Sequence, residues 1–274
     1  MPAAVVPVAI GAAAAVGEPT DPVWWRVAAA LVVSLMLQVG VNYANDYSDG
    51  VRGTDDVRVG PTRLVASGLA SPSAVKRAAL VSFGLAAAAG LAVALSTSFV
   101  LLVVGAAAIA AGWFYTGGPK PYGYLGLGEV FVFVFFGLVA TAGTTFAAIE
   151  SITALSLVMG CAAGSLACAL LVINNLRDIP TDREVGKKTL AVRLGEQRTR
   201  WFYVGLIATA FVLCGVGAFW RVPVLLGLLA LPMAIRPARS VLDGAMGAAL
   251  IPVLGETGKL QLAWGLLVTV GLVL

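Results

Sequence analysis

Long apolar stretches separated by short polar segments run through the whole chain of 274 residues. As helices, stretches of this length cross the roughly 30 Å hydrocarbon core of a bilayer. Their apolar positions are continuous rather than alternating, which favours helices over the strands of a membrane barrel. We therefore expect an all-α transmembrane bundle that forms a single domain over residues 1–274. The pattern predicts nine membrane helices and a broken helix between the last two; the nine lie at 3–16, 23–46, 75–95, 99–116, 126–149, 152–175, 200–219, 222–236 and 257–274, and the broken helix at 241–254.

Composition supports a membrane protein and narrows its chemistry. The mean hydropathy is +0.94 and only 12% of the residues are charged, which excludes an ordinary soluble domain. The net charge of +4 does not indicate nucleic acid, because the basic residues are concentrated in a few loops. The three cysteines are isolated in apolar stretches, and the chain has no histidine. His-ligated haem, His-type zinc sites and imidazole bases are therefore excluded.

The basic residues also predict an orientation. Most of the 18 Lys and Arg residues fall in two loops, at 47–77 and 177–200, which nine helices place on one side of the membrane. Loops rich in Lys and Arg stay in the cytoplasm. We therefore expect a multi-pass protein of the bacterial cytoplasmic membrane, with the N-terminus inside and the C-terminus outside.

Two carboxylate clusters stand where predicted helices run into these basic loops. The first contains Asn42, Asn45, Asp46 and Asp49, followed by Asp55 and Asp56; the second contains Asn174, Asn175, Asp178 and Asp182. Helix positions three or four apart share a face, so each cluster presents its oxygen atoms on one side. Pro180 is expected to bend the second helix end. If the two faces lie opposite each other, they form one oxygen-rich site.

Such a site suits Mg²⁺, which takes carboxylates together with waters and substrate phosphates. Basic side chains nearby would neutralise the remaining phosphate charge. The candidates for that role are Arg63, Lys187, Lys188 and Arg193. The pattern therefore indicates a divalent cation that carries a phosphate-rich substrate into a membrane protein.

Simpler interpretations compete with this one. Each cluster alone could be an ion pair at the membrane boundary, but two matched clusters, both with Asn, favour the metal site. Glu129 is interpreted either as the partner of a basic group or as an interfacial residue. Four phenylalanines at the start of the fifth helix are interpreted as lipid or core packing rather than as a substrate tunnel: Phe131, Phe133, Phe135 and Phe136.

The sequence around both clusters resembles the UbiA-type membrane prenyltransferases. The run from Asn45 to Asp55 resembles the first Asp-rich motif of that family, and Asp178 to Asp182, followed by Gly-Lys-Lys at 186–188, resembles the second. Gly53 stands where the first motif would have its last Asp. This departure, with the segments 60–68, 115–129 and 250–260, is similar to the subgroup that prenylates 1,4-dihydroxy-2-naphthoate. The likeness covers almost the whole chain. The basic residues that usually precede the first helix are missing, which predicts a natural start further upstream.

The resemblance implies Mg²⁺-dependent transfer of a polyprenyl group from an allylic diphosphate to an aromatic acid, with loss of CO₂ and without a protein nucleophile. The metal ligands that it implies are Asn45, Asp46, Asp49, Asp55, Asp178 and Asp182. The substrate contacts are Asn42, Asn45, Arg63, Lys120, Asn175, Lys187, Lys188 and Arg193. Tyr115 would offer an aromatic face near the reacting carbons. Among these residues, Asp46, Asp49, Asp178, Asp182 and Tyr115 are the candidate catalytic groups.

Other functions remain open at this point. Within the family, the acceptor is alternatively 4-hydroxybenzoate, a porphyrin or a glycerol phosphate. From a different class, a cation-coupled transporter also uses carboxylates in helices. A CDP-alcohol phosphotransferase is disfavoured because its compact Asp-rich signature is absent. The sequence sets neither the prenyl length nor the oligomeric state.

Overall fold

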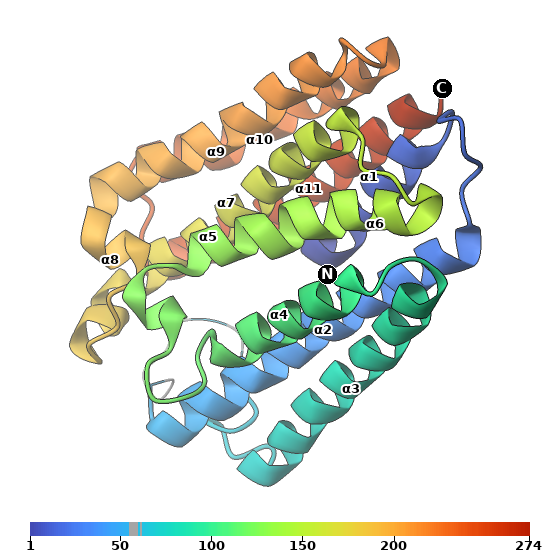
Figure 1. Cartoon of the computed structure of the whole chain (residues 1–274). Helices are drawn as coiled ribbons and strands as arrows, with labels where there is room; N and C mark the ends of the chain where they lie inside the picture. Colours follow the sequence, from blue (N-terminus) through green and yellow to red (C-terminus); the bar gives the residue numbers. More distant parts are fainter. Residues whose placement is uncertain (55–59, 61) are drawn as a thin grey trace.

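The computed structural model describes residues 1–54, 60 and 62–274, and all regular secondary structure in this part of the chain is helical, with no strand (Figure 1). This confirms the all-α class. The elements, in order, are α1 (Pro2–Ala15), α2 (Trp24–Arg52), α3 (Pro72–Ser96), α4 (Val100–Phe114), η1 (Tyr122–Leu125), α5 (Gly128–Val132), η2 (Phe133–Val139), α6 (Ala140–Ile149), α7 (Ala154–Glu184), α8 (Leu190–Leu194), α9 (Glu196–Gly217), η3 (Val222–Ala230), α10 (Leu231–Leu242), η4 (Gly247–Ala249) and α11 (Leu250–Val273).

The described residues contain 6 helical segments long and apolar enough to cross a membrane. They are Trp24–Arg52, Pro72–Ser96, Gly128–Ile149, Ala154–Glu184, Glu196–Gly217 and Val222–Leu242. Two shorter apolar helices, α1 and α4, fall at the predicted first and fourth positions. The chain is thus a multi-pass membrane protein, while the number of nine crossings stays a prediction.

Several helices extend beyond the bounds predicted from hydropathy. α2 continues to Arg52 rather than ending at 46, and α7 continues through Pro180 to Glu184 rather than ending at 175. Hydropathy detects only the apolar part of a helix, whereas backbone hydrogen bonds continue into polar turns. α2 stops at Gly53, whose φ of 70° is the left-handed conformation that commonly ends helices. The predicted broken helix at 241–254 is instead the end of α10, η4 and the start of α11.

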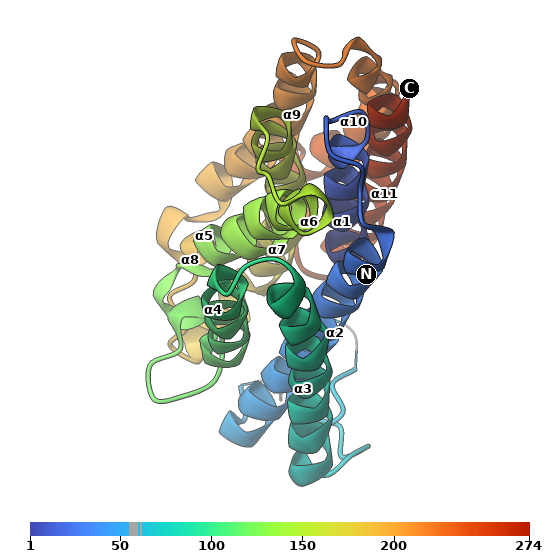
Figure 2. The same ribbon diagram turned by 45° about the vertical axis from the view of Figure 1, so that its right-hand side comes forward.

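The helices form two groups with the cavity described below between them. In both views α2, α3 and α4 lie together, beside the group of α1, α5 to α7 and α9 to α11 (Figures 1 and 2). Within the first group, Phe83 of α3 fills the space above Gly40 of α2 and Gly112 of α4. The second group surrounds α7, the most deeply buried of the candidate spans.

Glycines set the distance between η2 and α7. A Cβ atom at Gly137 would lie 2.5 Å from the Cα atom of Gly164, so only glycine fits there. Such close backbone contact is typical of helix packing in membranes. η2 is a π-helical segment in the middle of the predicted fifth helix, and π-segments often mark functional sites. Hydropathy carries no signal for it.

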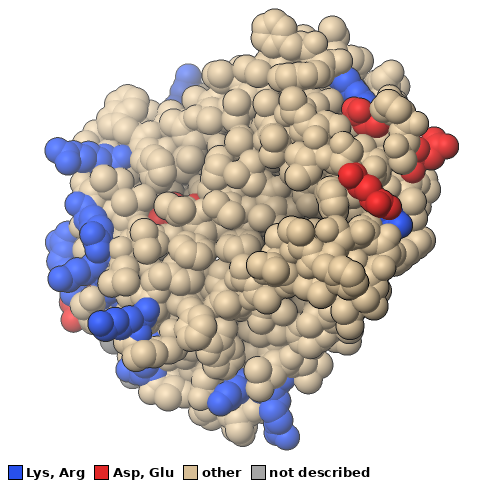
Figure 3. Space-filling view, in the orientation of Figure 1, with Lys and Arg blue, Asp and Glu red and all other residues tan. Residues whose placement is uncertain are grey.

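Charged residues separate toward opposite ends of the bundle. In Figure 3, Lys and Arg gather along the end of the molecule where α2 and α7 finish, and most of the visible Asp and Glu lie at the other end. At that other end, Arg26 pairs with Glu150 at 2.8 Å. At the same end, the Arg221 guanidinium donates hydrogen bonds to the carbonyl groups of Val16 and Leu272. These residues lie at the C-terminal ends of α1 and α11.

Candidate active site

A cavity of about 900 Å³ runs between α2 and α7, and its polar end lies at the last turns of these two helices. All four described carboxylates of the two clusters border it: Asp46, Asp49, Asp178 and Asp182. Asn42, Asn45, Asn174 and Asn175 border it as well. The structure thus brings together the two clusters that lie about 130 residues apart in the sequence.

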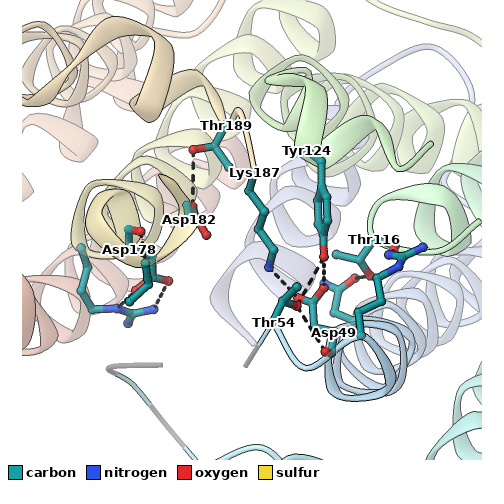
Figure 4. Close-up of polar contacts among 12 residues, drawn as sticks. Asp49, Thr54, Thr116, Tyr124, Asp178, Asp182, Lys187 and Thr189 are labelled. Atoms are coloured by element: carbon teal, nitrogen blue, oxygen red, sulfur yellow. Dashed lines mark hydrogen bonds and ion pairs between the residues drawn. The ribbon is translucent and has the colours of Figure 1, made fainter. Parts of the chain in front are cut away.

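On the α2 wall, Asp49 is bound by two side chains from other elements. The Tyr124 hydroxyl donates to its Oδ1 at 2.6 Å, and the Lys187 ammonium donates to its Oδ2 at 3.2 Å (Figure 4). One helical turn earlier, Asn45 accepts a hydrogen bond from the Thr116 hydroxyl at 2.8 Å. These partners come from the loops after α4 and α7, so the loops fix the side chains of α2.

On the α7 wall, Asp178 and Asp182 stand one turn apart. The Arg177 guanidinium binds Asp178 through two nitrogens, each at 2.7 Å, and is itself almost fully buried. Asp182 has a weaker partner in Thr189, whose hydroxyl is 3.5 Å from Oδ2. Asp182 is therefore the less restrained of the two carboxylates.

Lys187 links the two walls. Figure 4 shows its side chain passing between Asp182 on α7 and the pair of Asp49 and Tyr124. Its ammonium lies 4.7 Å from the centre of the Tyr124 ring. Burial lowers the pKa of Lys187, but the charges of Asp49, Tyr124 and Asp182 outweigh burial, so the pKa is raised. The ammonium therefore acts as the counter-ion of both walls.

Tyr115 closes the polar end from the α4 side. It borders the cavity and meets Tyr122 edge to face, with ring centroids 5.5 Å apart. Burial, with a smaller contribution from Glu129, raises the pKa of Tyr115, which keeps its phenol neutral. Gly123 and Gly128 pack directly on its ring, where a Cβ atom would lie 3.0 to 3.2 Å away.

Away from the carboxylates, the cavity becomes apolar. Its walls there come from α2, α4, α5, η2 and α6, and include Val33, Leu37, Leu101, Val104, Phe131, Phe135, Phe136 and Val139. Three of the four phenylalanines that we interpreted as packing residues line the cavity: Phe131, Phe135 and Phe136. Phe131 stacks on Tyr122 with centroids 4.0 Å apart, so an aromatic wall connects the polar and apolar parts.

Glu129 is buried, and no basic residue in the described part of the chain forms an ion pair with it. It lies on α5, where its Oε1 accepts a hydrogen bond of 2.9 Å from the Asn175 amide. No described residue donates to its Oε2. Because Glu129 takes the Asn175 amide nitrogen, the amide oxygen is the atom left to face the cavity.

Not all predicted residues meet at the cavity. Arg63 and Lys187 border it, but Lys120, Lys188 and Arg193 are exposed and do not. Arg193 instead donates to the backbone carbonyl of Lys188 at 3.1 Å. Residues 55–59, and with them the predicted ligand Asp55, lie outside the described part of the chain.

The carboxylates at the polar end of the cavity offer oxygen atoms, the ligands that hard divalent cations prefer. Among the described residues, no three His, Cys, Asp or Glu side chains converge closely enough to form a metal cage. Mg²⁺ does not require one, since it commonly binds one or two carboxylates and completes its octahedron with waters and phosphate oxygens. Asp49 and Asp182 face a common space in which Lys187 holds the only positive charge seen between them in Figure 4. The donor set of this site therefore fits a hard divalent ion.

Sequence reasoning missed several residues of the site. Gln38 borders the cavity one turn before Asn42, with a buried Oε1 that no described residue binds. Its spacing from Asn42 was a usable signal. Thr116 and Arg177 gave none, because their roles depend on which loops reach the helix ends.

Comparison with known proteins agrees with this geometry. Residues 4–271 match the UbiA prenyltransferase family. The chain is 51% identical over 268 residues to a 1,4-dihydroxy-2-naphthoate octaprenyltransferase of Mycobacterium tuberculosis, covering 98% of this chain and 91% of that protein. A protein of Escherichia coli with the same name is 35% identical, covering 92% of this chain and 87% of its own length.

Solved structures share the fold at much lower identity. A UbiA homologue from Aeropyrum pernix superposes with a TM-score of 0.74 at 16% identity, covering 98% of this chain and 96% of its own. A homologue from Archaeoglobus fulgidus, bound to GPP and Mg²⁺, superposes with a TM-score of 0.62 at 15% identity, covering 98% and 97% of the two chains. The family match covers nearly the whole chain, and the similar proteins match it over almost their full length. The chain therefore belongs to the UbiA prenyltransferase family.

Proposed function

We propose that this protein transfers a polyprenyl group from an allylic diphosphate to 1,4-dihydroxy-2-naphthoate, with loss of CO₂ and diphosphate, to give demethylmenaquinol, the reduced form of demethylmenaquinone. The observation that carries the proposal is the meeting of Asp49 from α2 with Asp178 and Asp182 from α7 around one cavity that continues into an apolar arm. A polar end beside an apolar arm matches a diphosphate joined to a hydrocarbon tail. The names of the relatives at 51% and 35% identity point to the same reaction.

The donor diphosphate would bind at the polar end. Asn45, Asp49, Asp178 and Asp182 are the residues that would hold Mg²⁺ there. Asp46 is not included, because both of its oxygens already accept backbone N–H groups. When bound, the metal supplies positive charge to the leaving diphosphate. Arg63 and Lys187 border the same space and would bind the remaining phosphate oxygens.

The prenyl tail would lie along the apolar arm, against Phe131, Phe135 and Phe136. This arm keeps water away from the reacting carbon, which is where a carbocation would otherwise be hydrolysed. Tyr115 and Tyr122 lie where the polar end meets the arm, so their ring faces are available to a developing allylic cation.

The reaction then needs no protein nucleophile. The allylic C–O bond breaks and its electron pair leaves with the diphosphate. The ring carbon that bears the carboxylate forms the new C–C bond to the allylic carbon. The bond to the carboxylate then breaks, its electron pair restores the aromatic ring, and CO₂ leaves. Asn175, oriented by Glu129, and Gln38 offer amide groups to the hydroxyl groups of the acceptor.

We further propose that the site faces the cytoplasm of a bacterial cell. The basic loops lie at the end of the bundle that carries the cavity, and such loops stay on the cytoplasmic side. Both substrates would therefore reach the site from the cytoplasm or from the inner half of the membrane.

The test is a reaction with purified protein in lipid nanodiscs, Mg²⁺, a polyprenyl diphosphate and either 1,4-dihydroxy-2-naphthoate or 4-hydroxybenzoate. We expect a prenylated, decarboxylated naphthoquinol by mass spectrometry, release of label from a carboxyl-labelled acceptor, and no product with Asp49→Asn. Product from 4-hydroxybenzoate alone would overturn the acceptor assignment. Absence of any prenyl transfer, with cation-driven uptake in proteoliposomes, would favour a transporter.

A further inference from the structure

Asp46 differs from the other acidic residues at the cavity in what binds it. The backbone N–H of Leu64 donates to its Oδ2 at 2.9 Å, and that of Val65 donates to its Oδ1 at 3.0 Å. The residue is only 6% exposed. Asp49, by contrast, is bound by the side chains of Tyr124 and Lys187, which can rotate away to admit another ligand. Backbone donors cannot rotate away without opening the segment that carries them.

The two donors, Leu64 and Val65, lie near the start of a turn at residues 62–70, which we call the Arg63 turn. The turn is closed by backbone bonds from Ser67 to Arg63 at 3.1 Å and from Ala70 to Leu64 at 3.1 Å. The first N–H groups of such a turn have no acceptor inside it, as at the start of a helix. The Asp46 carboxylate therefore acts as a cap supplied by another element, with charge-assisted bonds.

Packing holds the same turn against α2. A Cβ atom at Gly50, one helical turn after Asp46, would lie 2.6 Å from the Cβ atom of Val65. The turn therefore lies directly on the α2 backbone. The cap and this contact together fix both the height and the orientation of the turn.

The Arg63 turn carries residues of the cavity. Thr62 and Arg63 border the cavity immediately before the two capped N–H groups. Just upstream, Gly60 lies against Arg177, where a Cβ atom would be 3.3 Å from the guanidinium carbon. Arg177 in turn holds Asp178. What Asp46 fixes is thus a turn whose first residues, Thr62 and Arg63, border the polar end of the cavity.

We propose that Asp46 is a positioning residue rather than a metal ligand: it caps the Arg63 turn and so places Arg63 at the donor diphosphate. The donor part of this statement rests on the proposed function, whereas the capping part does not. The four acidic residues then have two roles: Asp46 caps the turn, and the remaining three bind the cation. Those three are Asp49, Asp178 and Asp182.

The experiment compares Asp46→Asn with Asp49→Asn in the purified full-length protein in nanodiscs. Three quantities are measured: hydrogen exchange of residues 62–70, Mn²⁺ affinity by electron paramagnetic resonance with a thiodiphosphate analogue of the donor, and the KM of the donor. For Asp46→Asn we expect faster exchange at 62–70, unchanged Mn²⁺ affinity, and a donor KM raised about tenfold, as for one lost charge-assisted hydrogen bond. For Asp49→Asn we expect weaker Mn²⁺ binding with the turn still protected.

Asp46→Asn overturns the proposal if it weakens Mn²⁺ binding as much as Asp49→Asn, or if it leaves exchange at 62–70 unchanged. Should that variant fail to fold, Val65→Pro removes one capped N–H without touching the carboxylate and must show the same pattern. The double variant Asp46→Asn with Arg63→Ala should have the donor KM of Arg63→Ala alone, because both act through one side chain. If neither aspartate affects Mn²⁺ affinity, the metal site of the proposed function fails, while the exchange data still decide the cap.

Discussion

Replacing Lys187 by methionine removes the ammonium that links the two carboxylate walls and keeps an unbranched side chain of similar length. Its Nζ lies 3.2 Å from Asp49 Oδ2, and the two side chains are 10% and 7% exposed. With an effective dielectric constant of about 20, the gross attraction at that distance is about 5 kcal/mol. Desolvation of both groups offsets most of this, which leaves about 1.5 to 3 kcal/mol for a hydrogen bond to a charged group.

The same ammonium is expected to bind the donor diphosphate, so a similar free energy is lost from donor binding. We expect the KM of the donor to rise about 10- to 150-fold in Lys187→Met, with little change in the KM of the acceptor. Initial rates in nanodiscs, at saturating acceptor and varied donor, measure this. Lys188→Met is the matched control, because the neighbouring Lys188 is exposed and does not border the cavity. An unchanged donor KM in Lys187→Met, or an equal rise in both variants, would refute the reasoning.

Three further outcomes are expected. Asp178→Asn should lower the transfer rate by about 10²- to 10³-fold while membrane insertion stays normal, because an electrostatic contribution at the leaving group is lost; near-normal turnover would contradict the metal assignment. Gly137→Ala should lower the free energy of unfolding by about 1 to 3 kcal/mol, because the added Cβ atom would overlap Gly164. Thermal unfolding in detergent measures this loss. The control variant Gly84→Ala should show no comparable loss, because the structure leaves open space at that position. The pKa of Lys187 is raised in the folded protein, so its ion pair with Asp49 is fully formed below the ordinary lysine value of 10.5. The ion pair is lost only as the pH rises through the higher pKa of the folded state. A donor affinity that already falls between about pH 8 and 10, with the protein still folded, would speak against this ion pair.

The sequence was sufficient for the features that depend on local spacing. Apolar length predicted the helices, and the three- and four-residue spacing placed Asn42, Asn45 and Asp49 on one side of α2, where all three border the cavity. The same spacing placed Asp178 and Asp182 together. Both patterns are properties of a single helix, and hydropathy and periodicity report on single helices.

Contacts between elements were beyond the sequence. Lys187 and Lys188 are adjacent and chemically identical, yet one is buried between two carboxylates and the other is exposed, because loop residues follow no fixed period. Asp46 looked like a ligand beside Asp49, but the position of the turn at 62–70 gives it backbone partners. The position of Phe131, Phe135 and Phe136 beside the cavity was also beyond the sequence, because an apolar cavity wall has the same composition as a packed core.

The guanidinium of Arg221 has a mechanical consequence for this membrane protein. It binds carbonyl groups at the ends of α1 and α11, at the opposite end of the bundle from Asp49, Asp178 and Asp182. One side chain thus joins the last turns of α1 and α11 by hydrogen bonds and opposes sliding of one helix along the other. When a long lipid substrate enters the cavity, we expect α1 and α11 to rotate about this joined end. The largest displacements of the two helices would then occur at their other ends, near the polar end of the cavity.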